Sequence, residues 1–212
     1  MRRPETIRAK LVQGRNRISS GRTAEVVSLV RANPKKANQL LECLWDEDSA
    51  VAMRAADALE KLTRPCSARP DITPDVVLVP LMQMLQRTWK DPLLGLLAEA
   101  TENKLRWCLA PVLPRFSLTV SECRRVAEIL ISYLDDKSSI VKTCALQGLA
   151  DLTRQDDSML PEVIDLLSIH SRSGTPAMCA RGRMLLKRLE ALRARKFSEV
   201  ISGSARSGKF RC

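Results

Sequence analysis

Hydrophobic and small residues recur along most of the chain at steps of three and four positions, which is the spacing of one face of an α-helix. The pattern is clearest in two stretches that lie ninety positions apart, DEDSAVAMRAADALEKLTR ending at Arg64 and DDKSSIVKTCALQGLADLTR ending at Arg154. Asp and Ser residues, which can cap a helix N-terminus, open both stretches, and Leu-Thr-Arg closes both. The repetition predicts two copies of one helical unit.

A looser third copy opens at Thr175, where Pro176 stands in the first turn of a helix and costs no hydrogen bond. Sliding the copies over one another pairs apolar with apolar positions and small with small ones. We expect the paired positions to form the repeat core: Leu41, Leu44, Val51, Ala55, Leu59, Leu62, Ile131, Leu134, Val141, Ala145, Leu149, Leu152, Met178, Leu186 and Leu189.

Between the two clear copies there is room for a further unit, with a first helix over residues 76–86 and a second over 93–103. The last apolar positions of successive units are then separated by 43, 47 and 37 residues, and are Leu62, Leu105, Leu152 and Leu189. A period near forty residues with two helices per unit is typical of an α-solenoid.

Proline interrupts this rhythm in two places. Residues 64–74, RPCSARPDITP, predict an irregular connection that is either a long loop between units, which we favour, or a segment that reaches over the binding surface. In residues 104–118, Pro111 and Pro114 predict a short or kinked extra helix that serves as a spacer. The helical pattern resumes after each of the two interruptions.

Composition supports a helical chain. Hydrophobic residues make up 45% of the 212 residues, aromatic residues only 3%, and glycine occurs eight times. This balance excludes a disordered chain and disfavours strands, so the sequence predicts an all-α fold. It has no apolar run long enough for a transmembrane segment, and its basic N-terminus lacks the apolar block of a secretory signal, so we expect a cytoplasmic protein.

The net charge of +11 is concentrated at the two ends. Residues 1–22 hold seven Arg or Lys and one Glu, and residues 181–212 hold ten and two, which leaves −3 for the middle. We therefore divide the chain into a basic N-terminal segment (1–22), partly helical or flexible, a solenoid domain (23–197) and a flexible basic tail (198–212). Two interpretations of the basic ends stay open: solvated, partly disordered segments that aid solubility, or basic segments that neutralise phosphates. In the second, one helix stripe supplies the contacts with anions or nucleic acid: Arg181, Arg183, Lys187, Arg188 and Arg195.

Signatures of catalysis are weak. The seven cysteines form no C-x-x-C pair, and His170 is the single histidine, so neither a zinc site nor a catalytic triad is expected. No phosphate-binding glycine motif follows a strand. Acidic pairs such as Asp135 and Asp136 fall at predicted turns, where capping explains them. We expect no catalytic residue, no metal and no cofactor.

The second helices of the two clear units resemble those of HEAT repeats. That resemblance rests on Asp46 and Val51 in one unit and on Asp136, Val141 and Lys142 in the other, each followed by small residues and Leu. The third unit keeps the proline of the pattern and lacks its Asp. The resemblance implies a right-handed α-α superhelix of about four to five HEAT-like helical repeats, an armadillo-type fold.

Such a fold implies a scaffold or adaptor that binds another protein and has no enzymatic activity. The alternative is a nucleic-acid-binding helical-repeat protein that contacts nucleic acid through its basic ends. Some bacterial alkylpurine DNA glycosylases have a similar HEAT-like architecture and use Trp and Asp side chains. This chain has those residue types in Trp45-Asp46, in Trp89-Lys90-Asp91 and in Trp107.

Overall fold

The computed structural model describes residues 5–14, 19–65 and 78–207, with the backbone alone for 78 and 196–207. Over these ranges the chain forms helices and short 3-10 turns, and no strand occurs in them. The protein is therefore all-α. The proline-rich connection predicted over residues 64–74 lies almost wholly outside the described residues, as do the first two positions of the helix predicted to begin at residue 76.

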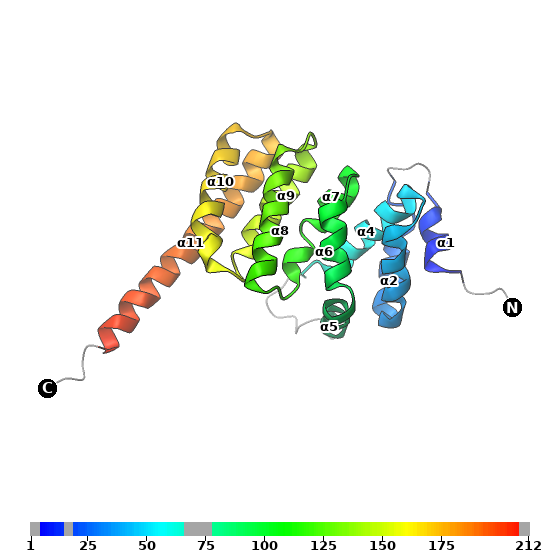
Figure 1. The fold of residues 1–212 in the computed structure, drawn as a ribbon, viewed down its shortest axis with the longest axis horizontal. Helices are drawn as coiled ribbons and strands as arrows, with labels where there is room; N and C mark the ends of the chain where they lie inside the picture. Colours follow the sequence, from blue (N-terminus) through cyan, green and yellow to red (C-terminus); the bar gives the residue numbers. More distant parts are fainter. Residues whose placement is uncertain (1–4, 15–18, 66–77, 208–212) are drawn as a thin grey trace.

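Eleven α-helices follow one another through the described ranges (Figure 1). Their bounds are α1 Ile7–Val12, α2 Thr23–Ala32, α3 Ala37–Glu42, α4 Ser49–Thr63, α5 Leu78–Thr88, α6 Lys90–Glu99, α7 Asn103–Leu109, α8 Val120–Ser132, α9 Ser139–Leu152, α10 Leu160–Ser173 and α11 Pro176–Ser207. The 3-10 turns include η2 Cys43–Trp45, η3 Leu113–Arg115 and η4 Tyr133–Asp135.

The helices form two layers. In one layer α4, α7, α9 and α11 pack side by side in that order. In the other, α2 and α3 lie on α4, α6 lies on α7, α8 on α9 and α10 on α11. Figure 1 shows these pairs following one another along the molecule, and α11 extends beyond its partner α10. Helix pairs stacked in this way share one core between neighbours.

The two repeated stretches form the equivalent helices α4 and α9, with matching ends. Asp48 caps α4 by accepting the Ala50 N–H at 2.9 Å, and Ser138 caps α9 by accepting the Val141 N–H at 3.4 Å. At the other end, Thr63 and Thr153 are buried, and each hydroxyl donates to a carbonyl of its own last turn. The Thr of each closing Leu-Thr-Arg therefore satisfies a helix C-terminus.

A second match between the two repeated stretches joins each of them to a preceding helix. Asp46 accepts two hydrogen bonds from the guanidinium of Arg8 in α1, at 2.6 and 3.0 Å. Asp136 accepts one at 2.6 Å from Arg106 in α7. Both aspartates also accept a backbone N–H two residues ahead. The residues that repeat in sequence are thus the residues that join neighbouring units.

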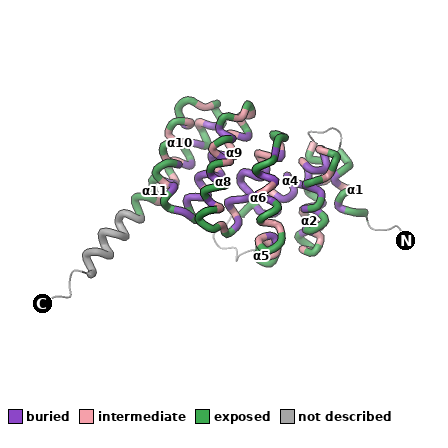
Figure 2. Tube along the Cα trace, in the orientation of Figure 1, coloured by how far each residue is buried: buried purple, intermediate pink, exposed green. Residues whose placement is uncertain are grey.

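A continuous hydrophobic core runs through the helices, and Figure 2 shows buried positions recurring from α1 to α11. Nearly all of the positions expected to form the repeat core are buried, and the two remaining ones, Ile131 and Leu186, are partly buried and pack against it. Gly148 lets α9 approach its neighbours closely, because an added Cβ there would stand 2.6 Å from the carbonyl oxygen of Ala110.

The middle of the chain differs from the prediction. The helix expected over residues 93–103 ends at Glu99, and a new helix, α7, begins at Asn103. The short extra helix predicted within residues 104–118 is present as α7, but it is not a spacer, since it packs against both α4 and α9 as a member of their layer. The break carries no Gly or Pro, and Arg106 stabilises it by donating to the Ala100 carbonyl at 2.7 Å. Helix α5 lies beside α4 and α6.

The two ends are partly built into the fold. In α1, Ile7 and Leu11 are buried against the core. Arg54 of α4 is 2% exposed and donates to the carbonyls of Leu11, Val12 and Ser19, which fastens the N-terminal segment to the domain. At the other end, the predicted tail begins inside α11, which continues to Ser207, and residues 208–212 lie outside the described part.

Candidate functional site

A cleft of about 1080 Å³ lies along the layer formed by α4, α7, α9 and α11. Side chains of all four helices line it, together with Met82 of α5 and the segment around η3. Five arginines and three acidic residues are among its described lining residues, an excess of two positive charges: Arg64, Arg115, Arg154, Arg181, Arg188, Asp57, Glu60 and Asp151.

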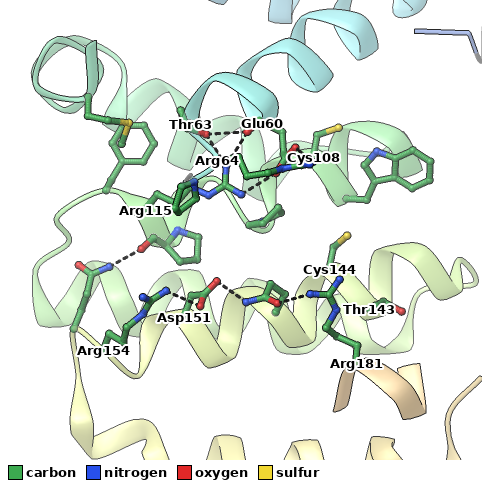
Figure 3. A pocket seen from close by; sticks show the side chains of 18 of the residues that line it. Glu60, Thr63, Arg64, Cys108, Arg115, Thr143, Cys144, Asp151, Arg154 and Arg181 are labelled. Atoms are coloured by element: carbon green, nitrogen blue, oxygen red, sulfur yellow. Dashed lines mark hydrogen bonds and ion pairs between the residues drawn. The ribbon is translucent and has the colours of Figure 1, made fainter. Parts of the chain in front are cut away.

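On the α4 side, one carboxylate is held between two guanidiniums (Figure 3). Glu60 accepts from Arg64 at 2.5 Å and from Arg115 at 2.8 Å. Arg115 also donates to the Glu60 carbonyl and to the Thr63 hydroxyl, so it is anchored to the end of α4. Burial alone raises the pKa of Glu60, but the hydrogen bonds from the two arginines outweigh it, and the pKa lies below its ordinary value.

On the α9 side the same arrangement recurs with other residues, of which Figure 3 labels Asp151 and Arg154. Asp151 accepts from Arg154 at 2.8 Å and from Arg188 of α11 at 3.0 Å. Gln147 donates to the second oxygen of Asp151 and accepts from Arg181 of α11. Residues of α9 thereby connect to two arginines of α11.

We call these the Glu60 cluster (Glu60, Arg64, Arg115) and the Asp151 cluster (Asp151, Arg154, Arg188). In each, the arginine of the closing Leu-Thr-Arg is the outer one, with a side chain that is 62% exposed. Each carboxylate is only 13% exposed. The remaining arginine comes from a segment later in the chain. Both clusters therefore present one exposed guanidinium to the cleft over a covered carboxylate.

Apolar groups and two thiols complete the lining. Pro111, Pro114 and Phe116 are buried, and Ile140 is 49% exposed. Burial raises the pKa of Cys108 to about 12 and that of Cys144 to about 11. Both side chains therefore stay as neutral thiols near pH 7, and neither is prepared to act as a nucleophile.

Of the basic stripe proposed on the last helix, only some residues line the cleft. Arg181 and Arg188 line the cleft and bond to α9, whereas Arg183, Lys187 and Arg195 are exposed and do not contribute to the cleft lining that is described. The sequence pattern did not indicate the Glu60 cluster or the partners of Arg188. The available signal was the repeated Leu-Thr-Arg, which puts Arg64 and Arg154 at equivalent places.

The tryptophans lie in two places. The rings of Trp45 and Trp89 are 6.0 Å apart and tilted by 30°, and Trp89 donates to Asn38. Trp107 lines the cleft, whereas the other two are not among its described lining residues. Asp46, next to Trp45, is engaged by Arg8, which lowers its pKa. The structure therefore does not gather the three tryptophans around one aspartate.

In the described part of the chain, no group of three or more His, Cys, Asp or Glu side chains is placed to hold a metal ion. None of the helices described is both long enough and apolar enough to cross a bilayer. His170 stands in the last turn of α10, and burial lowers its pKa.

No protein-family model matches the chain, and comparisons with curated proteins and with solved structures gave no match. The function has to be argued from the cleft itself.

Proposed function

We propose that the protein is a non-enzymatic interaction module of HEAT type, and that its cleft binds an extended segment of another protein. The observation that carries this proposal is the cleft along α4, α7, α9 and α11, whose described lining combines apolar groups with arginines. Helical repeats stacked side by side present an elongated surface that needs no reactive group. An extended peptide suits such a surface, because its side chains can contact both the apolar and the charged positions of the lining.

A protein ligand suits the cleft better than nucleic acid. A surface that binds a phosphate backbone uses cations that are free to replace counterions. Here four of the five described lining arginines already bond to Glu60 or Asp151, so the described lining keeps an excess of only two positive charges, fewer than a surface that follows a phosphate backbone would offer. Arg183, Lys187 and Arg195 of α11 are exposed and lie outside the described lining.

Site-specific photocrosslinking tests this proposal. Ile140 lines the cleft and is 49% exposed, so a benzoylphenylalanine there would face a bound segment. Ile169 of α10 is 58% exposed and lies outside the described lining, which makes it a matched control. Each variant of the full chain is irradiated in cell extract, and the adducts are mapped by mass spectrometry.

We expect discrete adducts at position 140 that map to one short segment of a partner, and background labelling at position 169. Equal labelling at the two positions would contradict the proposal, because it would show that the cleft selects no ligand. Adducts with nucleic acid at position 140 would favour the alternative function.

A further inference from the structure

We propose that the partner segment carries two acidic side chains, and that the Glu60 cluster and the Asp151 cluster each bind one of them. This inference rests on the proposed function and names the chemistry that the cleft recognises. It follows from the charge, exposure and unused donors of the two clusters.

The two clusters carry a net positive charge. Each cluster sets two guanidiniums against one carboxylate and so keeps one positive charge. The other acidic residue of the described lining, Asp57, is paired with Lys61 at 2.7 Å. Arg181 adds a guanidinium whose bonding partner is a neutral amide, that of Gln147. A ligand with carboxylates would complete this charge balance, whereas a basic segment would meet like charge.

The outer arginines of the two clusters also keep N–H donors that do not bond to their own carboxylate. Within the part of the chain that the structure describes, Arg154 bonds to Asp151 through Nη2, which leaves its Nε and Nη1 without a protein acceptor. Arg64 bonds to Glu60 through Nε and Nη2, which leaves Nη1 without an acceptor among the described residues. Guanidinium N–H groups donate charge-assisted hydrogen bonds to carboxylates, and these are about twice as strong as neutral ones.

The outer arginines are also preorganised for ligand binding. Both outer arginines are already oriented by a carboxylate that is 13% exposed, so less side-chain entropy is lost when a ligand binds. The arrangement occurs twice, once at the end of α4 and once at the end of α9, on opposite sides of the cleft (Figure 3). One extended segment that follows the cleft can therefore meet both.

The test uses a display library of random 12-residue peptides selected on the full chain, followed by fluorescence anisotropy with a selected peptide. The double variant R64Q/R154Q removes one exposed guanidinium from each cluster. R87Q/R172Q removes two exposed arginines outside the described lining and matches the change in net charge. Thermal melts of both variants confirm that they fold.

We expect selected peptides enriched in Asp and Glu. Affinity should fall about tenfold for each lost contact, so about a hundredfold in R64Q/R154Q, with little change in R87Q/R172Q. Replacing the acidic residues of the peptide by Asn and Gln should have the same effect on the wild-type chain. Peptides without acidic enrichment, or unchanged affinity in R64Q/R154Q, would overturn the inference.

The proposed function fails separately. If the selected peptides crosslink to benzoylphenylalanine at position 140 but show no acidic preference, the interaction module is supported and the acidic ligand is contradicted. Peptides that do not crosslink at position 140 would remove both. A labelled DNA duplex is run beside the peptide, and tighter, cleft-dependent binding of that duplex would also overturn both.

Discussion

Gly148 provides a sharp test of how closely the helices pack. An added Cβ at this position of α9 would stand 2.6 Å from the Ala110 carbonyl oxygen and 2.7 Å from the Leu130 side chain. The first of these atoms belongs to the backbone, so the substitution G148A forces α9 away from its neighbours. Gly95, inside α6, is the matched control, because a Cβ there meets nothing within 4 Å.

Both substitutions bring the same gain in helix propensity, about 1 kcal/mol for alanine over glycine in a helix interior. Only G148A adds overpacking, which costs about 1–3 kcal/mol. The free energy of unfolding should therefore rise by about 1 kcal/mol in G95A, and that of G148A should lie about 1–3 kcal/mol below the G95A value.

The assay is thermal unfolding followed by circular dichroism at 222 nm, with urea titrations alongside. For a chain of this size, 1 kcal/mol shifts Tm by about 2–4 °C, so G148A should melt about 2–12 °C below G95A. Equal stabilisation by the two substitutions would refute the reasoning, because it would show that α9 does not approach the Ala110 backbone as closely as the structure has it.

Three further predictions follow from the described contacts. Replacing Ala145, which is fully buried, by Leu should lower the free energy of unfolding by about 1–3 kcal/mol, measured by urea titration, whereas an unchanged midpoint would place Ala145 outside the helix seam. R54M removes the hydrogen bonds that Arg54 donates to the carbonyls of Leu11, Val12 and Ser19, so it should cost about 3 kcal/mol and expose the N-terminal segment to limited proteolysis first, and protease resistance equal to wild type would contradict this. The pKa of Glu60 is lowered in the folded chain, so its stabilisation is present above its ordinary pKa of 4.5 and is lost as pH falls through the lower folded value. As the pH falls below 4.5, the wild type should therefore lose more stability than E60Q, and parallel losses would contradict the ion-pair geometry.

Sequence pattern was sufficient for the elements with strong periodicity. The helices α4 and α9 carry small and apolar residues at regular steps between clear caps, and α11 begins at the proline expected to open it. The division between α6 and α7 could not be read in this way. Residues 99–103 are Glu-Ala-Thr-Glu-Asn, which a helix tolerates, and the break is stabilised by a distant side-chain contact, from Arg106 to Ala100.

The candidate site was less accessible to sequence reasoning because its partners come from different units. The stripe of Arg181 and Arg188 was visible from a spacing of seven residues, but that both would face α9 depends on how α11 packs. Nothing in the sequence links Arg115 to Glu60, which lies 55 positions earlier. Such pairs follow from the stacking of units rather than from the pattern within one.

The two copies of Leu-Thr-Arg nevertheless have one physical explanation. Leucine fills the core, threonine satisfies a carbonyl of the last turn, and arginine folds back onto an acidic residue of its own helix. A later unit then adds a second arginine to that same acid, Arg115 in one case and Arg188 in the other. The acid is thereby covered from both sides, and the outer arginine is left facing the cleft. The repetition that builds the fold thus also places two equivalent cationic groups on one surface, and this double placement is what the peptide-binding experiments test.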